Sequence, residues 1–96
     1  MKTLHSKYKV PNGKLIIADI VIEDSLIKEI QISGDFFLEP PIVLEMINKA
    51  LIGLSIQTNM QEIKTIINRA IPENTVFFGF SPESIAITIL KAFTNE

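Results

Sequence analysis

The segment G-D-F-F-L-E-P at residues 34–40 divides the chain into two parts whose apolar residues follow different periods. Before it, residues 15–23 and 26–34 alternate between apolar and polar positions, as strands with one buried face do. After it, apolar residues recur every three or four positions, which is the period of amphipathic helices. Strands followed by helices predict an α+β domain, in which three helices pack on one face of a small antiparallel sheet of three or four strands.

The first predicted hairpin begins with Tyr8 and Val10, which alternate with lysines as in a half-buried strand. Asn12 and Gly13 follow, and both residue types tolerate the positive φ that a tight turn requires. The next strand, residues 15–23, places isoleucines and an alanine on one face and keeps apolar residues on the other. Because both faces carry apolar side chains, we expect this strand to be central.

The third predicted strand covers residues 26–34. Strict alternation places Ile30 and Ile32 on one face and Ile27 on the other. Later in the chain, residues 76–80 can add a short fourth strand. The sheet is therefore predicted as a three-stranded meander with one optional addition.

The first predicted helix continues over residues 42–54 after Pro40 and Pro41. Both prolines suit a first helical turn, where the N–H groups they lack would have no partner. Gly53 is typical of a helix end. The helix is therefore expected to include both prolines.

Capping signals predict two further helices. The second helix is expected to begin near Thr58 or Asn59, of which Asn59 stands three residues before Glu62, and Pro72 ends it. Ser81 begins the third helix, with Pro82 at its first helical position.

Composition excludes several classes of function. The 96 residues have room for one domain, residues 1–96, with one core. No cysteine is present, which excludes disulfides, thiolate metal sites and thiol nucleophiles. The net charge of −2 and a single arginine argue against nucleic-acid binding, and no apolar run approaches the ~20 residues of a membrane span. We expect a cytoplasmic protein that binds neither nucleic acid nor membrane.

No complete set of catalytic residues is recognisable. His5 is the only histidine, and we expect it to be a bystander in a frayed N-terminus. Neither a zinc-type spacing nor a P-loop is present. The chain alone is therefore expected to hold no catalytic residues, no cofactor and no metal.

Three motifs carry a family resemblance: K-V-P-N-G-K at residues 9–14, G-D-F-F-L-E-P at 34–40 and F-G-F-S-P-E-S at 78–84. Together they resemble the C-terminal accessory domain of lipoate–protein ligases, over residues 6–93. In that family the domain is fused behind a large catalytic domain or made as a separate small subunit, and a chain of this length matches the second arrangement. The sequence has Asn12 where the family often has glycine, and Pro41 follows the motif proline directly.

The resemblance implies an accessory subunit that is not catalytic alone. It implies a heterodimer with a large catalytic subunit, which uses lipoate and ATP to form lipoyl-AMP for transfer to lipoyl carrier domains. The accessory domain also resembles the fold of iron–sulfur scaffold and sulfur-acceptor proteins. A cysteine-free relative of those proteins, acting as a binding or adaptor module, is the alternative, although cluster ligation and persulfide transfer require thiolates.

Three segments are candidates for contact with the large subunit. They are the hairpin with Lys9, Gly13 and Lys14, the strand exit with Asp35, Phe36 and Phe37, and the segment with Phe78 before the third helix. We expect Lys14 to face the nucleotide end of the large subunit's site; alternatively it is a solvated residue at a strand start. Asp35 is expected to bind backbone N–H groups in its turn, and the rings belong either to the core or to the interface.

Overall fold

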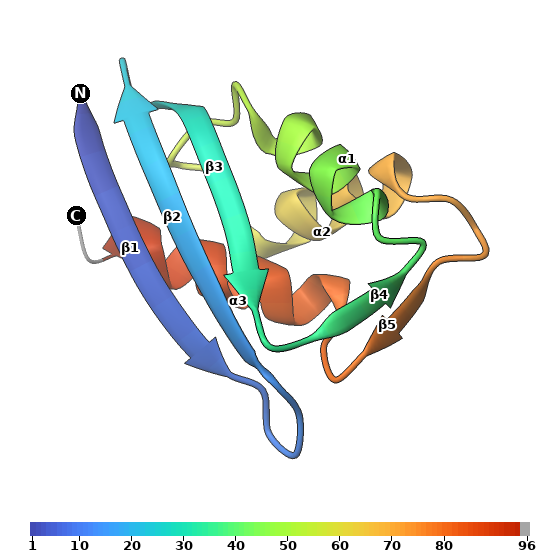
Figure 1. The fold of residues 1–96 in the computed structure, drawn as a ribbon. Helices are drawn as coiled ribbons and strands as arrows, with labels where there is room; N and C mark the ends of the chain where they lie inside the picture. Colours follow the sequence, from blue (N-terminus) through green and yellow to red (C-terminus); the bar gives the residue numbers. More distant parts are fainter. Residues whose placement is uncertain (95–96) are drawn as a thin grey trace.

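The computed structural model describes residues 1–94, which form two antiparallel sheets and three helices (Figure 1). In chain order the elements are β1 (Lys2–Lys9), β2 (Leu15–Glu23), β3 (Leu26–Gly34), β4 (Phe37–Glu39), α1 (Val43–Leu51), α2 (Met60–Ala70), β5 (Val76–Phe78) and α3 (Pro82–Thr94). The main sheet has the order β1-β2-β3, and β4 pairs with β5 in a second sheet. The predicted α+β class is confirmed. The short strand near residues 76–80 exists, but it pairs with a strand that the sequence did not predict and does not extend the main sheet.

The helices cover one face of the main sheet, as predicted (Figure 1). α3 packs on β1 and β2, α1 packs on β3, and α2 packs on α1 and α3. The core between them is built mainly from isoleucines, and those of the helices include Ile47, Ile63, Ile67, Ile85 and Ile89. Within residues 1–94, no helix covers the opposite face of the sheet.

β2 is the central strand, as its sequence indicated. Its residues Ile16, Ala18 and Ile20 are fully buried under the helices. Ile17 and Val21 on the open face are half-buried, because neighbouring strands shield them from both sides. Two-sided apolar patterning here reflects a central position in the sheet.

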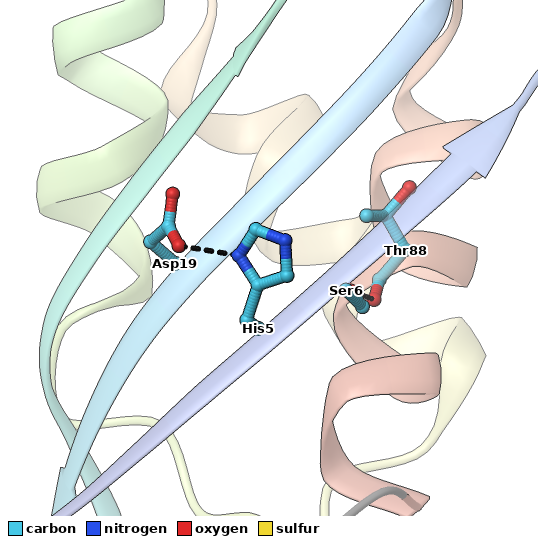
Figure 2. A network of polar contacts seen from close by, with 4 residues as sticks. All are labelled: His5, Ser6, Asp19 and Thr88. Carbon is cyan, nitrogen blue, oxygen red and sulfur yellow. Dashed lines mark hydrogen bonds and ion pairs between the residues drawn. The ribbon is translucent and has the colours of Figure 1, made fainter.

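β1 begins at Lys2, so the expectation of a frayed N-terminus around His5 was wrong. The sequence of β1 does not alternate regularly between apolar and polar residues, because a polar residue occupies one of its buried positions. Leu4 and Ser6 both face the core. The Ser6 hydroxyl donates to the backbone oxygen of Thr88 in α3 at 2.6 Å (Figure 2). This bond satisfies a buried hydroxyl and allows serine where the pattern calls for an apolar residue.

β3 departs from strict alternation. Ile27 and Ile30 both face the core, so the prediction that Ile27 lies on the opposite face was wrong. The register with β2 shifts between Val21 and Ile22, which leaves Lys28 as an extra residue in β3. Such a β-bulge changes the face of every residue on one side of it.

The first helix starts later than predicted. The N–H groups of Val43 and Leu44 donate to the oxygens of Pro40 and Pro41, at 3.1 and 3.2 Å. These bonds span three residues and form a turn ahead of α1, so the prolines precede the helix. The helix also ends earlier than predicted, at Leu51, and Gly53, with φ of 91°, follows this end.

The caps of the other two helices agree with the sequence. Asn59 Oδ1 accepts the N–H of Glu62 at 2.9 Å, and the helix ends before Pro72. At the start of α3, Ser81 Oγ accepts the N–H of Ser84 at 3.2 Å, and Ser84 Oγ accepts the N–H of Ser81 at 2.7 Å. Local capping chemistry therefore sets where both helices begin.

Replacing Asn59 by alanine is expected to lower the free energy of unfolding by about 1 kcal/mol, because one N–H of the first turn of α2 loses its partner. Urea denaturation measures this change. Asn59→Asp is the matched control, since its carboxylate can accept the same bond and interacts favourably with the helix dipole. A loss for Asn59→Asp equal to that for alanine would contradict the capping role.

Candidate partner interface

The three candidate segments lie together at the end of the molecule that carries the β1–β2 turn (Figure 1). The N–H of Lys14 donates to the oxygen of Gly79 at 2.8 Å, which joins the hairpin to the segment after β5. The N–H of Leu15 donates to Asp35 Oδ1 at 2.9 Å, which joins the hairpin to the exit of β3. These bonds hold the segments in a fixed arrangement, although Lys14 and Gly79 are 65 residues apart in the sequence.

The turn between β1 and β2 uses its glycine differently from the prediction. Asn12 has a φ of 59°, but Gly13 is not among the residues with positive φ. A Cβ on Gly13 would lie 2.5 Å from the oxygen of Gly79. Glycine is required here because two backbones approach closely.

The two candidate lysines of the hairpin are placed differently. Lys9 turns back over the hairpin, and its ammonium donates to the backbone oxygens of Gly13 and Val10. The Lys14 stem runs along Gly79, and its exposed ammonium has no hydrogen bond or ion pair with residues 1–94. Lys9 therefore stabilises the turn, and Lys14 is the lysine available to a partner.

Gly79 allows this contact because it has a φ of 86° and no side chain. Gly79→Ala is expected to lower the free energy of unfolding by about 2–3 kcal/mol, because the backbone is left-handed and the new Cβ would collide with Lys14 Cγ. Gly53→Ala is the matched control: its φ is 91°, but nothing lies within 4 Å of its Cβ position. Guanidinium denaturation should show a loss of only about 1 kcal/mol for the control. Equal losses would show that Lys14 does not pack against Gly79.

Asp35 binds a backbone N–H group, as expected, although the donor is not in its own turn. The donor is Leu15, which lies 20 residues earlier at the start of β2. Asp35 follows the last residue of β3 and gives Leu15 the hydrogen bond that a longer β3 would supply. The carboxylate thus has a structural role at the edge of the sheet.

The adjacent phenylalanines at the exit of β3 have opposite environments. Phe36 is 9% exposed and stacks on Phe80, with ring centroids 4.0 Å apart. Phe37 is 71% exposed. One ring therefore belongs to the core and the other faces solvent.

The exposed ring of Phe37 has an aromatic neighbour across the small sheet. Phe78 is its register partner in β5 and is 50% exposed, and Val76 of the same strand is 47% exposed. We call these three residues the aromatic face. Beside it, a pocket of about 300 Å³ is lined partly by Phe37, Pro41 and Leu44. This pairing of strands was not predicted from the sequence, because β4 is only three residues long. The two F-F pairs at residues 36–37 and 77–78 were the only indication of it in the sequence.

His5 is ordered but lies away from the aromatic face. Its Nδ1 is 2.6 Å from Asp19 Oδ1 across β1 and β2 (Figure 2). The neighbouring Ser6 points to the opposite face of the sheet, toward α3, so these three side chains do not form a catalytic triad.

Two further searches cover only the residues that the structure describes. Within residues 1–94, no group of three or more histidine, cysteine, aspartate and glutamate side chains is arranged to hold a metal ion. No helix in the same range is long and apolar enough to cross a membrane.

Comparisons with known proteins agree on one family. None of the curated proteins matches the sequence. One solved chain is 26% identical to this one and superposes on it with a TM-score of 0.76. The match covers 92% of this chain and 94% of the solved chain. Its structure is described as an archaeal lipoylation system, a bi-partite lipoate protein ligase and its E2 lipoyl domain from Thermoplasma acidophilum. Residues 3–89 match the bacterial lipoate protein ligase C-terminus, and the chain therefore belongs to that family.

Proposed function

We propose that this chain is the accessory subunit of a two-part lipoate–protein ligase. It binds a large catalytic subunit, and the complex converts lipoate and ATP to lipoyl-AMP for transfer to lipoyl carrier domains. Membership of the ligase C-terminal family supports this proposal, as does the similarity to a chain from a bi-partite ligase system. The chain contributes surface and positioning, and the large subunit contributes the chemistry.

The aromatic face is the observation that carries the docking part of the proposal. Large aromatic side chains are normally buried, yet Phe37 and Phe78 are 71% and 50% exposed and lie side by side. Paired exposed rings on a rigid element are typical of the anchors that dominate protein interfaces. The pocket beside Phe37 can receive an apolar side chain of the large subunit.

Lys14 gives the same end of the molecule an available positive charge. Its backbone is held by Gly79 and the adjacent Leu15 by Asp35, so the base of the side chain is fixed relative to the core. An ammonium at this position can approach a phosphate or carboxylate at the nucleotide end of the large subunit's site. Such contacts complete a site and hold mobile loops closed over a reactive intermediate.

The proposal is tested by measuring lipoate- and ATP-dependent adenylate formation. The large subunit is assayed alone, this chain alone, and the two mixed. Activity only in the mixture is the expected result. A large subunit that is equally active alone, with no complex formed in analytical ultracentrifugation, would refute the accessory role.

Lys14→Ala is expected to reduce adenylate formation by the complex at least about tenfold, because one charge-assisted contact contributes about 1.5–3 kcal/mol. The free energy of unfolding should change little, since the ammonium has no partner among residues 1–94. Lys49→Ala, at an exposed lysine of α1, is the matched control and should leave adenylation unchanged. Unchanged activity of Lys14→Ala would place this lysine outside the site.

A further inference from the structure

Within residues 1–94, the outer edge of β1 has no neighbouring strand, since β1 is the end strand of the main sheet. Lys7 directs its oxygen outward, where it accepts the ammonium of Lys91 at 2.7 Å. Backbone groups alternate in direction along an antiparallel strand, so those of Thr3 and His5 point outward as well. No group among residues 1–94 bonds to them. Thr3 and His5 therefore present N–H and C=O groups that are unpaired within residues 1–94.

Two lysines that have no carboxylate partner flank these open backbone groups. Lys7 and Lys91 form no ion pair with a carboxylate of residues 1–94. The ammonium of Lys91 is held in place by the Lys7 oxygen and lies 5.7 Å from the centre of the Tyr8 ring. Asp19, on the neighbouring strand, is engaged by His5 at 2.6 Å. In a chain whose net charge is −2, this edge is a local concentration of positive charge.

We propose that this edge of β1 binds an extended acidic segment of a partner protein as an added strand. Thr3 and His5 offer up to about four backbone hydrogen bonds to such a segment. Carboxylates of the segment reach Lys7 and Lys91, and the Lys91 ammonium retains two N–H donors after bonding the Lys7 oxygen. Backbone pairing supplies affinity, and the lysines select for negative charge.

Charge decides the kind of partner. A second copy of this chain would bring its own edge lysines against the first set, and like charges in register are destabilising. A nucleic acid satisfies the lysines but leaves the N–H and C=O groups of Thr3 and His5 unpaired. An acidic peptide strand satisfies both. This surface is separate from the aromatic face, and its assignment does not rest on the proposed ligase function.

The test titrates the ¹⁵N-labelled full chain with a capped peptide of alternating threonine and glutamate. We expect saturable binding with slowed hydrogen exchange at the amides of Thr3 and His5. A peptide N-methylated on its pairing edge, and one with lysine in place of glutamate, should each bind about tenfold more weakly or worse. Added salt should weaken the binding of the acidic peptide.

The double variant Lys7→Gln and Lys91→Gln should bind the acidic peptide about tenfold more weakly, and Lys49→Gln, on α1, should bind it normally. Absence of saturable binding up to about 1 mM peptide would overturn the proposal. Equal binding of the N-methylated peptide would overturn strand addition. Tighter binding of a ten-nucleotide oligo-dT, without protection at Thr3 and His5, would replace the proposal with a nucleic-acid site.

Discussion

Replacing Phe37 and Phe78 together by alanine is expected to weaken binding to the large ligase subunit at least about 100-fold, because each buried aromatic anchor contributes about 2 kcal/mol or more. The free energy of unfolding should change by less than about 1 kcal/mol, because these rings are 71% and 50% exposed in the free chain. Isothermal titration calorimetry measures the affinity, and urea denaturation measures the stability.

The matched control for this variant is Ile52→Ala. Ile52 is 52% exposed, a fraction close to that of Phe78, and follows α1 away from the aromatic face. It should bind the large subunit with unchanged affinity. If the control weakens binding as much as the double variant, or if the double variant binds normally, the aromatic face is not the docking surface.

Phe36→Ala is expected to lower the free energy of unfolding by about 3–5 kcal/mol, although it changes the residue next to Phe37. Phe36 is 9% exposed and stacks on Phe80, whose ring also meets Phe77 edge to face at 4.9 Å. Removing the ring leaves a cavity and ends both the stacking and the apolar contacts. Such a loss is a large share of the roughly 5–15 kcal/mol that stabilises a small domain.

Urea denaturation of Phe36→Ala and Phe37→Ala tests this contrast directly. Phe36→Leu is a further control, because it keeps apolar volume without the ring and should lose less than alanine does. A loss below about 1 kcal/mol for Phe36→Ala would show that the stack of Phe36 on Phe80 does not stabilise the fold.

Local patterns were enough for much of the secondary structure. The bounds of β2 and β3 agree with the alternating runs at residues 15–23 and 26–34, and Asn59 and Ser81 begin their helices as predicted. Strand alternation and capping depend on neighbours within a few residues, which a sequence displays directly. The errors lie where distant contacts intervene. Ser6 is buried because Thr88 accepts its hydrogen bond, and Ile27 is buried because a bulge opposite Val21 changes its face.

Sequence motifs identified the candidate interface residues and the family but not how those residues lie together. The contacts of Lys14 with Gly79 and of Leu15 with Asp35 join three motifs that are remote in sequence. β4 was missed because a three-residue strand carries too little alternation to be distinguished from a loop. Its partner strand supplies the hydrogen bonds that define it.

The sequence by itself determined the α+β class, the central position of β2, the starts of α2 and α3, and the resemblance to lipoate–protein ligase accessory domains. Only the tertiary structure decided which phenylalanine is buried, which lysine is available, and which strand edge is open. Periodicity and capping depend on interactions between residues a few positions apart, so they can be read directly from the sequence. Burial and hydrogen-bond satisfaction depend on which segments meet after folding, so Phe36 and Phe37, adjacent and chemically identical, have different roles.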